Sequence, residues 1–443
     1  MERYERYKDS GVKWIGEIPS HWEVVRLKSV IKDSQSGVWG EDPKHDGSDT
    51  LCLRVADFNY NNGYLKEDNL TYRNYGKELS SNKQLQMRDL LLEKSGGGDL
   101  YPVGRVVRYN FNGIVATCSN FIQKLTPRDN VDSDFIYYLF RTMYYLKVNG
   151  LYYNQTTGIQ NLKVKEYLSQ TVFLPPLSEQ QAIANYLDTA TAKIDEAIAQ
   201  QQKMIDLLNE RKQIIINNAV TKGLNPDAPM KDSGVDYIGL IPEHWVVRRM
   251  ASLGVFSKGG GISRDNLLEE GEPAILYGDI YTKYNYFAED IKNHVSKKVA
   301  LASVEVHKNE LLMTGSGETK EDIGKTIVFL GNKAYAGGDV IIFKQDNNNS
   351  SFLSYALNSS YAKNFRYKES KGEIVVHIYA NAVRQLYLAL PDITEQNSIV
   401  EYLNNKVGII DSEICVVRKQ ISLLQERKQI IINDVVTGKV KVS

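Results

Sequence analysis

Apolar residues recur with heptad spacing in two widely separated segments of the chain. The positions are Ile194, Ile198, Ile205, Leu208, Ile215 and Ala219 in the first segment, and Ile410, Ile414, Val417, Ile421, Leu424, Ile431 and Val435 in the second. Sustained spacing of this kind predicts a coiled-coil seam. We therefore expect two helices of about 40 residues, each roughly 60 Å long, that pair antiparallel as a spacer. The alternative is that each helix packs only on its own domain.

Three motifs occur twice, in the same order, once in each half of the chain. The pairs are DSGVKWIGEIPSHW (9–22) with DSGVDYIGLIPEHW (232–245), LPPLSEQ (174–180) with LPDITEQ (390–396), and LLNERKQIIIN (207–217) with LLQERKQIIIN (423–433). We call the first pair the amino-terminal motifs and the second pair the junctions. Two copies are too few for a solenoid, so the repeat predicts a pseudo-twofold protein, in effect a fused dimer. An ordinary duplication, whose symmetry has no function, is the alternative.

The repeat also predicts the domain boundaries. They are a first domain at 1–173, a spacer helix at 174–223, a linker at 224–231, a second domain at 232–389 and a second spacer helix at 390–443. Ser178 and Thr394 are the expected N-caps of the two helices. Gly223 suits the end of the first helix.

The long stretches between the motifs predict mixed α/β domains, because short apolar runs alternate there with turn-rich segments. Helices are expected at 135–148 and 351–365. Weak correspondences survive between the two stretches, such as Gly104-Arg105 with Gly324-Lys325. A shared scaffold with different detailed residues is what two related recognition modules with different targets would show.

Several residues of these stretches are candidates for contact with DNA. Tyrosine, amide and hydroxyl groups suit base edges and phosphates, and lysine or arginine near glycine suits a closely approaching phosphate. The candidates are Lys94, Arg105, Tyr152, Tyr153, Asn154, Gln155 and Thr156 in the first half, and Lys258, Arg264 and Lys325 in the second. For each residue, an ordinary solvated surface remains the alternative.

A protein partner is expected near the repeated ERKQIIIN segment of the helices. Ile214, Ile216, Ile430 and Ile432 lie off the seam, where a two-stranded coiled coil would leave them in water, and exposed apolar surface often marks a partner site. The neighbouring basic residues complete the predicted surface, which comprises Arg211, Lys212, Ile214, Ile216, Arg427, Lys428, Ile430 and Ile432. The alternative is burial of the isoleucines against this protein's own domains.

Composition narrows the class of protein. The 443 residues include 54 Lys+Arg and 54 Asp+Glu, so contacts to nucleic acid must come from local patches rather than from net charge. Three widely spaced cysteines give neither a zinc pattern nor a disulfide framework. No apolar stretch is long enough to span a membrane, and the charged amino terminus lacks the core of a signal peptide. A soluble cytoplasmic protein is expected.

A catalytic or metal site cannot be assembled from the sequence. Gly324-Lys325-Thr326 lacks the glycine spacing of a phosphate-binding loop, and the pair Glu369 and Lys371 has no suitable upstream acid beyond Asp346. His21 and His244 recur beside tryptophans, but no acidic or cysteine partner recurs with them at ligand spacing, so we expect a structural role. No catalytic residue and no metal ligand is therefore proposed.

The ordered motifs resemble those of the specificity subunit of type I restriction–modification systems. The residues that carry the resemblance are Trp14 to Trp22 and Tyr237 to Trp245, the junctions extended to Ile183 and Ile399, and the twin ERKQ helices. Tyr237 departs from the tryptophan of the first copy. The second half also lacks a clear version of the segment 158–162.

The resemblance implies a non-catalytic subunit that binds double-stranded DNA. Each target-recognition domain would recognise one half of a bipartite, asymmetric site, and the helices would set the spacing and dock two modification (methyltransferase) subunits. Adenine methylation with S-adenosylmethionine would reside on those subunits, and ATP-driven translocation with Mg-dependent cleavage on restriction subunits, with no cofactor on this chain. Two alternatives remain: a DNA endonuclease with an unrecognised catalytic centre, and a coiled-coil scaffold that binds only proteins.

Overall fold

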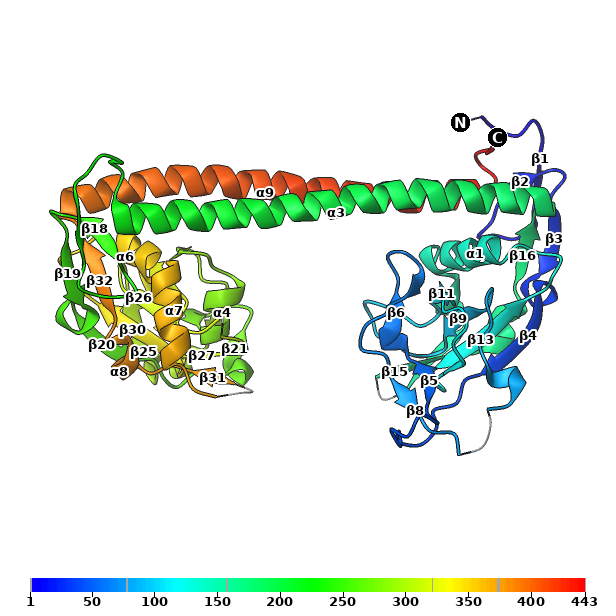
Figure 1. Cartoon of the computed structure of the whole chain (residues 1–443), viewed down its shortest axis with the longest axis horizontal. Coiled ribbons are helices and arrows are strands. Elements are labelled where there is room, and N and C mark those ends of the chain that lie inside the picture. The colour runs from blue at the N-terminus through cyan, green and yellow to red at the C-terminus, as the bar shows by residue number, and fades with distance from the viewer. Residues whose placement is uncertain (1, 77–78, 157, 321, 373–374, 443) are drawn as a thin grey trace. The chain divides into compact units, whose positions relative to one another are not determined.

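The chain folds as two compact units, each built around one α/β domain. A computed structural model describes residues 2–76, 79–156, 158–320, 322–372 and 375–442. Unit 1 comprises 1–203 with 418–443, and unit 2 comprises 204–417. Two long helices, α3 (Leu177–Lys222) and α9 (Ile393–Val436), each belong partly to one unit and partly to the other (Figure 1). The predicted fold class, two α/β domains with a pair of long helices, is confirmed.

Domain 1 is organised around a four-stranded antiparallel sheet. Its strand order is β11 (Val106–Arg108), β9 (Leu90–Glu93), β13 (Ile122–Pro127) and β4 (Ile31–Ser36). A second sheet has the order β12 (Ala116–Cys118), β5 (Thr50–Leu53) and β8 (Tyr72–Arg73), and β5 runs parallel to β12. Smaller pairings join β6 (Phe58–Asn59) to β7 (Tyr64–Leu65), and β10 (Ser95–Gly96) to β15 (Ile159–Leu162) and β14 (Tyr153–Thr156).

Domain 2 repeats this plan with longer sheets. One has the order β20 (Val255–Lys258), β30 (Val340–Lys344), β26 (Leu311–Thr314), β28 (Thr326–Phe329) and β23 (Phe287–Ala288). The other has the order β21 (Leu267–Leu268), β24 (Asn293–Val295), β22 (Glu272–Ile275), β29 (Lys333–Ala336) and β25 (Val304–His307), with β22 parallel to β29. The pair β27 (Ser316–Gly317) and β31 (Val376–His377) takes the place of the β10–β15 pairing.

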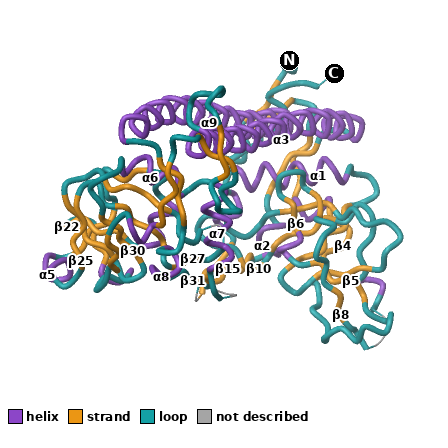
Figure 2. The backbone as a smooth tube through the Cα atoms, turned by 60° about the vertical axis from the view of Figure 1, so that its left-hand side comes forward, coloured by secondary structure: helices purple, strands orange, loops and turns teal. Residues whose placement is uncertain are grey.

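A short helix connects each sheet to the long helices. In unit 1, α1 (Ser133–Tyr145) lies between α3 and the strands of domain 1 (Figures 1 and 2). Its buried Leu139 belongs to the same apolar cluster as Leu92 of β9, Leu187 of α3 and Val435 of α9. This cluster ties one domain to the beginning of one long helix and the end of the other, so the ends of the long helices are part of the domain cores.

Domain 2 divides its equivalent helix in two. The helix expected at 351–365 is α6 (Ser350–Leu357) followed by α7 (Ser360–Glu369). The break falls at Asn358, whose side-chain amide donates to the carbonyl of Thr326 at 2.6 Å and accepts from the amide of Thr326 at 3.2 Å. Because this side chain is bonded to the first residue of β28, the chain turns at Asn358 instead of continuing as one helix. Short helices α2 (Val164–Leu168), α4 (Tyr277–Thr282), α5 (Lys297–Leu301) and α8 (Ala380–Val383) complete the two domains.

The amino-terminal motifs attach each domain to its following long helix. In unit 1 the hairpin of β1 (Tyr7–Asp9) and β2 (Glu17–Pro19) leads to Trp22, which is fully buried. Its indole Nε1 donates to Glu179 Oε2 at 3.0 Å, and His21 Nε2 lies 2.6 Å from Glu179 Oε1. Burial acts to raise the pKa of Glu179, but these hydrogen bonds outweigh it and hold the pKa below its ordinary value.

The same contact is made a second time in unit 2. After β17 (Met230–Asp232) and β18 (Leu240–Pro242), the buried Trp245 donates to Glu395 Oε2 at 3.1 Å, and His244 lies 2.7 Å from the same oxygen. Each repeated histidine thus contacts the glutamate of its junction, as a structural role predicts. In each unit the strand after the motif then pairs with the strand before the junction, β3 (Glu23–Arg26) with β16 (Thr171–Leu174) and β19 (Val246–Arg249) with β32 (Tyr387–Leu390).

The glutamine of each junction has a second, equally repeated role. Gln180 accepts a hydrogen bond from the amide of Asp132 at 2.9 Å, and Gln396 accepts one from the amide of Asn349 at 2.9 Å. Asp132 and Asn349 are the N-caps of α1 and α6. The Glu-Gln dipeptide of the junction therefore holds the amino-terminal motif with one residue and the short helix with the next.

The expected N-caps of the long helices are wrong by two residues. Helix α3 begins at Leu177 and α9 begins at Ile393, so Ser178 and Thr394 lie inside the first turn. In α9 the cap is Asp392, whose carboxylate accepts from the amide of Glu395 at 2.9 Å. The prolines that precede the helices therefore predict the first helical residue better than the hydroxyl residues do.

Ion pairs between the long helices fix their antiparallel register within each unit. In unit 1, Lys428 Nζ of α9 lies 2.6 Å from both carboxylate oxygens of Asp195 in α3. In unit 2, Lys212 Nζ of α3 lies 2.7 Å from Asp411 of α9. Both members of the second pair differ by 216 residues from their counterparts in the first, which is the offset of the junctions and of the repeated helix sequence. The repeat is therefore preserved at the level of single side-chain contacts.

Hydropathy along the helices gives one further property. Of the helices in the described part of the chain, none has the length and apolar character needed to cross a membrane.

Candidate nucleic-acid interface

The predicted tyrosine-rich segment forms part of a small sheet with the predicted Lys94. The segment 153–156 is strand β14, which pairs with β15, and β15 also pairs with β10 directly after Lys94. The ammonium of Lys94 donates to the hydroxyl of Ser36 at 2.5 Å. The backbone of Lys94 thus neighbours β15, its carbonyl accepting from the amide of Leu162 at 2.8 Å, while its ammonium is bonded to β4, and its contact with DNA stays a prediction.

The side chains of this hairpin divide between core and solvent. Tyr152 and Tyr153 are half-buried against the apolar cluster of unit 1, and the ring of Tyr152 lies 6.0 Å from that of Tyr167. Asn154 and Gln155 are exposed, while Thr156 contributes its backbone to β14 opposite Ile159. The exposed amides are therefore better placed for contact with DNA than the two tyrosines, whose rings support the fold.

Arg105 is engaged in a buried ion pair. Its guanidinium makes two hydrogen bonds to Glu93, at 2.8 and 3.0 Å, and lies 3.8 Å above the ring of Tyr60. Burial raises the pKa of Glu93, and Arg105 opposes this shift. A carboxylate that is only 1% exposed needs such a partner. The arginine thus has a structural role, and its remaining edge faces a pocket.

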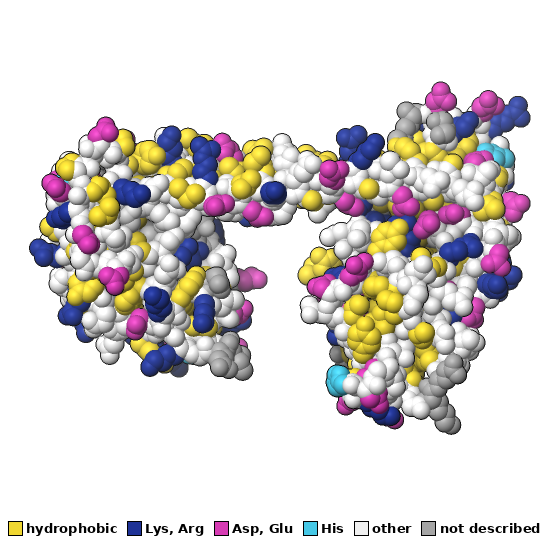
Figure 3. All heavy atoms as spheres, viewed as in Figure 1, with side chains coloured by type: hydrophobic (Ala, Val, Ile, Leu, Met, Phe, Trp, Pro, Cys, Tyr) yellow, Lys and Arg dark blue, Asp and Glu magenta, His cyan; other side chains and the backbone are white. Residues whose placement is uncertain are grey.

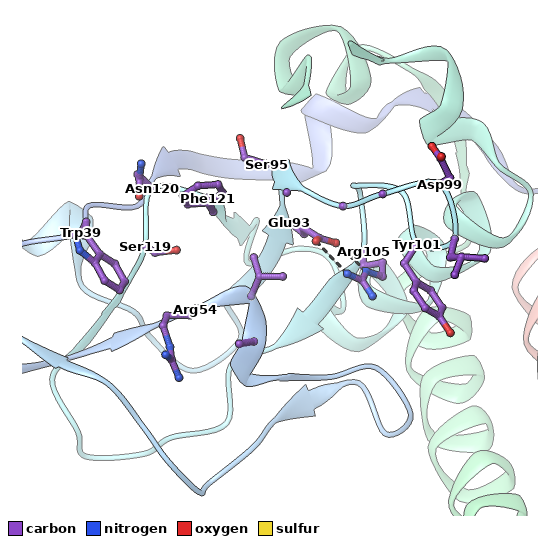
Figure 4. A pocket seen from close by; sticks show the side chains of 16 residues that line it. Trp39, Arg54, Glu93, Ser95, Asp99, Tyr101, Arg105, Ser119, Asn120 and Phe121 are labelled. Carbon is purple, nitrogen blue, oxygen red and sulfur yellow. Dashed lines mark hydrogen bonds and ion pairs between the residues drawn. The ribbon is translucent and has the colours of Figure 1, made fainter. Parts of the chain in front are cut away.

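This pocket, which we call pocket 1, has a volume of about 960 Å³. Figure 4 shows Trp39, Arg54 and the loop of Ser119, Asn120 and Phe121 on one side, with the paired Glu93 and Arg105 beside Tyr101 on the other. Trp39, Tyr101 and Phe121 are exposed for large aromatic residues. Exposed aromatic rings beside arginine and amide groups offer both stacking and hydrogen bonding to a nucleic acid.

Domain 2 places two of the predicted residues in one pocket, which we call pocket 2. Lys258 and Arg264 both line it, together with Tyr277, Tyr281 and Lys283, and its volume is about 700 Å³. Lys258 lies 3.4 Å from Asp339, whereas Arg264 is exposed and makes no ion pair with any described residue. The predicted basic loop is thus a wall of a polar pocket.

Lys325 does not lie in pocket 2. Its ammonium donates to the carbonyl of Tyr284 at 2.6 Å, near Lys363 of α7 and Lys212 of the long helix α3. Burial, with help from nearby Lys363 and Lys212, lowers the pKa of Lys325 to about 8, and Asp322 opposes the shift. A contact of Lys325 with DNA stays a prediction, at a place apart from Lys258 and Arg264.

The predicted partner-binding residues separate into exposed and buried groups. Ile214 and Ile430 are 50% and 46% exposed, whereas Ile216 and Ile432 are fully buried in the cores of units 2 and 1. The expectation of exposure is therefore wrong for Ile216 and Ile432, because the end of each long helix packs on a domain and not only on the other helix.

The basic residues of the same segments divide in the same way. Lys212 and Lys428 are held in the ion pairs between the helices, while Arg211 and Arg427 are exposed. Exposed apolar side chains are visible along both helices between charged ones (Figure 3).

Some residues of the site escape prediction from sequence. Glu179 and Glu395 stand at equivalent positions of the repeated junctions. Because the tryptophan motif is repeated as well, this double repetition is a signal that could have predicted the contact between each glutamate and its tryptophan. Trp39 and Asn120 belong to no repeated motif, and they meet Arg54 only because three strand ends converge. Among the described residues, no group of three or more His, Cys, Asp or Glu side chains is arranged to hold a metal ion.

Comparison with known proteins connects these features to one family. Residues 19–205 match the model of the "Type I restriction modification DNA specificity domain". The chain is 25% identical to the specificity subunit of the type I restriction enzyme MjaVIII from Methanocaldococcus jannaschii, over 98% of this chain and 97% of that one. It is 27% identical to the EcoBI specificity subunit from Escherichia coli, over 56% of this chain and 53% of that one.

The fold is shared with a solved structure over nearly the whole chain. A chain in a solved structure on complex assembly and conformational transition of the type I R-M system superposes with a TM-score of 0.69 at 14% identity, covering 96% of this chain and 99% of that one. Two α/β domains on a pair of long helices are thus the fold that the two chains share. Over nearly its whole length the chain is thus similar to the specificity (S) subunits of type I restriction–modification systems, and its first half matches the model of their DNA specificity domain.

The buried position of Lys325 predicts a dependence of stability on pH. Its folded pKa of about 8 lies below the ordinary value of 10.5, so the charged lysine destabilises the folded state fully below pH 8, and this penalty disappears as pH rises toward 10.5. Lys325→Met should raise the free energy of unfolding at pH 7 by about 1–2 kcal/mol, after allowance for partial solvent exposure.

Urea unfolding at several pH values measures this difference. The gain of Lys325→Met over the wild type should shrink toward zero between pH 8 and pH 10.5. Lys308→Met, at an exposed lysine of the same unit, is the matched control and should change stability little at any pH. A gain for Lys325→Met that is independent of pH would contradict the assignment.

Proposed function

We propose that each α/β domain recognises one half of a split, asymmetric double-stranded DNA site, and that the helices set the distance between the halves. The observation that carries this proposal is a scaffold built twice, with diverged surfaces. Both domains keep the tryptophan–glutamate contact and the glutamine contact of the junction, whereas their DNA-candidate residues differ. A duplicated scaffold with different functional groups suits a protein that recognises two different short sequences.

The helices also offer two equivalent surfaces for partner subunits. Leu207 and Ile214 are about half exposed on α3, and Leu423 and Ile430 are about half exposed on α9. The two pairs are related by the offset of 216 residues, and each pair is spaced by one heptad, so its members share a helix face. Exposed apolar pairs of this kind suit docking of one modification subunit on each, two in total.

The chemistry of the complex would then reside on its other subunits. Modification subunits would supply adenine methylation with S-adenosylmethionine, and restriction subunits would supply ATP-driven translocation and Mg-dependent cleavage. This chain would contribute DNA sequence recognition and the attachment of those subunits, in the cytoplasm where the cell's DNA is found.

Exchange of one domain tests the proposal of two half-sites. Residues 31–173 would be replaced by those of a relative, and the chimera would be co-expressed with its modification subunits. Mapping of methylated adenines by single-molecule sequencing should give a bipartite motif in which one half changes while the other half and the gap stay the same. A continuous motif, or a change in both halves, would contradict the proposal.

Charge substitution on the helices tests the two docking surfaces. Ile214→Glu and Ile430→Glu should each remove one of two bound modification subunits, because a carboxylate would have to be buried against an apolar surface. The mass of the purified complex, measured by light scattering, reports the stoichiometry. Leu301→Glu, at an exposed residue of α5 and outside the two long helices, is the control and should leave two subunits bound. Retention of both subunits by the two helix variants would refute this placement.

A further inference from the structure

Pockets 1 and 2 occupy the same place in the repeated fold. Each lies at the carboxyl ends of a pair of parallel strands, β5 with β12 in domain 1 and β22 with β29 in domain 2. Cys118 is aligned with Leu53 in the first pair, as Ala336 is with Ile275 in the second. The carboxyl ends of parallel strands are a recurrent place for ligand binding, because the loops that follow the strands converge there.

The backbone around the two pockets is matched in detail. After the second strand of each pair, the amide of Ser119 donates to Leu53 at 2.8 Å, and that of Gly337 donates to Ile275 at 2.9 Å. After the first strand, a carboxylate three residues on accepts from the chain: Asp57 from Arg54 at 2.7 Å, and Asp279 from Leu276 at 2.9 Å. Structurally equivalent loops of the two domains therefore form the two pockets.

These matched loops supply much of the lining of both pockets. The turn after the first strand contributes 54–56 to pocket 1 and 276–278 to pocket 2, and the loop after the second strand contributes 119–121 and 337–339. Segments after β10 and β27 add to each wall. Two independent cavities with the same construction are difficult to explain as accidents of packing.

The functional groups on this common frame are different. Phe121 of pocket 1 stands where pocket 2 has Asp339, and Asn120 stands where pocket 2 has Gly338. Pocket 1 is lined largely by apolar and aromatic groups, including Trp39. Pocket 2 is more polar, with Arg264 among its basic residues. Conserved backbone with exchanged hydrogen-bonding groups is the arrangement expected where two related sites distinguish different base sequences.

Arg54 is positioned as a donor for a base edge. Asp57 holds its guanidinium through Nη2 at 2.9 Å, yet the side chain stays 37% exposed at the pocket wall. Asn120, in the facing loop, is exposed. An arginine fixed by a carboxylate can present two donors to guanine, and an asparagine can bond adenine through a donor and an acceptor.

We infer that pockets 1 and 2 contact the base edges that define the two DNA half-sites, with Arg54 and Asn120 as specificity-determining residues of domain 1 and Arg264 as that of domain 2. This inference rests on the proposed function, because it assigns the site within each domain that recognises DNA. It also distinguishes these residues from Lys325, which faces another part of domain 2, and from the half-buried Tyr152 and Tyr153.

Motif mapping with single substitutions tests the assignment. Full-length chains carrying Arg54→Ala, Asn120→Ala or Arg264→Ala would be co-expressed with the modification subunits, and methylated adenines would be mapped genome-wide. Each of the first two variants should relax one base position of one half-site, and Arg264→Ala should relax a position of the other half-site. Loss of one bidentate contact corresponds to a fall in discrimination at that position of roughly 5- to 150-fold.

The control and the second readout separate specificity from folding. Lys32→Ala removes an exposed charge at the opposite end of β4 from the pocket and should leave the motif unchanged. Asn120 and Arg264 are exposed, and Arg264 makes no ion pair with a described residue, so their variants should keep the wild-type melting temperature. Arg54→Ala loses the contact with Asp57 and is expected to be less stable.

The outcomes also distinguish this inference from the proposed function. A bipartite motif that all three variants leave unchanged would overturn the assignment of the pockets while leaving the two half-sites in place. A motif that relaxes in both halves with any single variant would likewise overturn it. A wild-type motif that is not bipartite would instead refute the proposed function itself.

Discussion

The register of the two long helices depends on a buried lysine charge that meets its carboxylate partner in only one alignment of the helices. The ammonium of Lys428 is only 6% exposed and lies between the carboxylate of Asp195 and the carbonyl of Asn61. A shift of the helices by one turn would leave this charge buried without its partner, which costs several kcal/mol, about 3–5 in comparable cases. Lys212 and Asp411 form the equivalent but more exposed pair in unit 2. Because each helix continues into a domain core at its end, this register also determines how the domains are held.

The contacts at the junctions explain why so few residues had to be kept in both halves. Glu179 accepts hydrogen bonds from a buried indole and contacts a histidine, and the next residue, Gln180, holds the start of α1. One dipeptide thus fixes two segments of the domain against the helix, and the second half repeats the arrangement. With the frame secured by these positions, the loops around the pockets are free to differ, and under the proposed function a difference there would change what each domain recognises without changing how it folds.

Sequence alone predicts the features that depend on local pattern. The heptad spacing predicts both helices, and the repeated motifs predict two α/β domains, because neither inference needs knowledge of distant contacts. Burial of Ile216 and Ile432 could not be predicted, since the heptad pattern describes the facing helix and not the domain that covers the helix end. The bond between Trp22 and Glu179 joins residues 157 positions apart, and only its repetition in the second half gives a sequence signal.

The candidate site shows the same limit more clearly. A local glycine-rich pattern predicts Lys258 and Arg264, and both line pocket 2. Arg105, by contrast, forms an ion pair with Glu93, and Lys325 bonds to a carbonyl outside pocket 2. Pocket 1 combines side chains from several separate segments, of which no single one has a distinctive composition. Convergence of loops at the ends of parallel strands is a property of topology, and it becomes visible only when the strand register is known.

The central claim, that paired helices hold two recognition domains at a set distance along DNA, is tested most directly by lengthening the helices. Four residues would be inserted into α3 between Asp195 and Lys212 and four into α9 between Asp411 and Lys428, which leaves both ion pairs in register. Each helix grows by about 6 Å, and at about 3.4 Å per base pair the gap in the methylated motif should grow by one or two base pairs with both half-sites unchanged. A motif that keeps its original gap would contradict the claim.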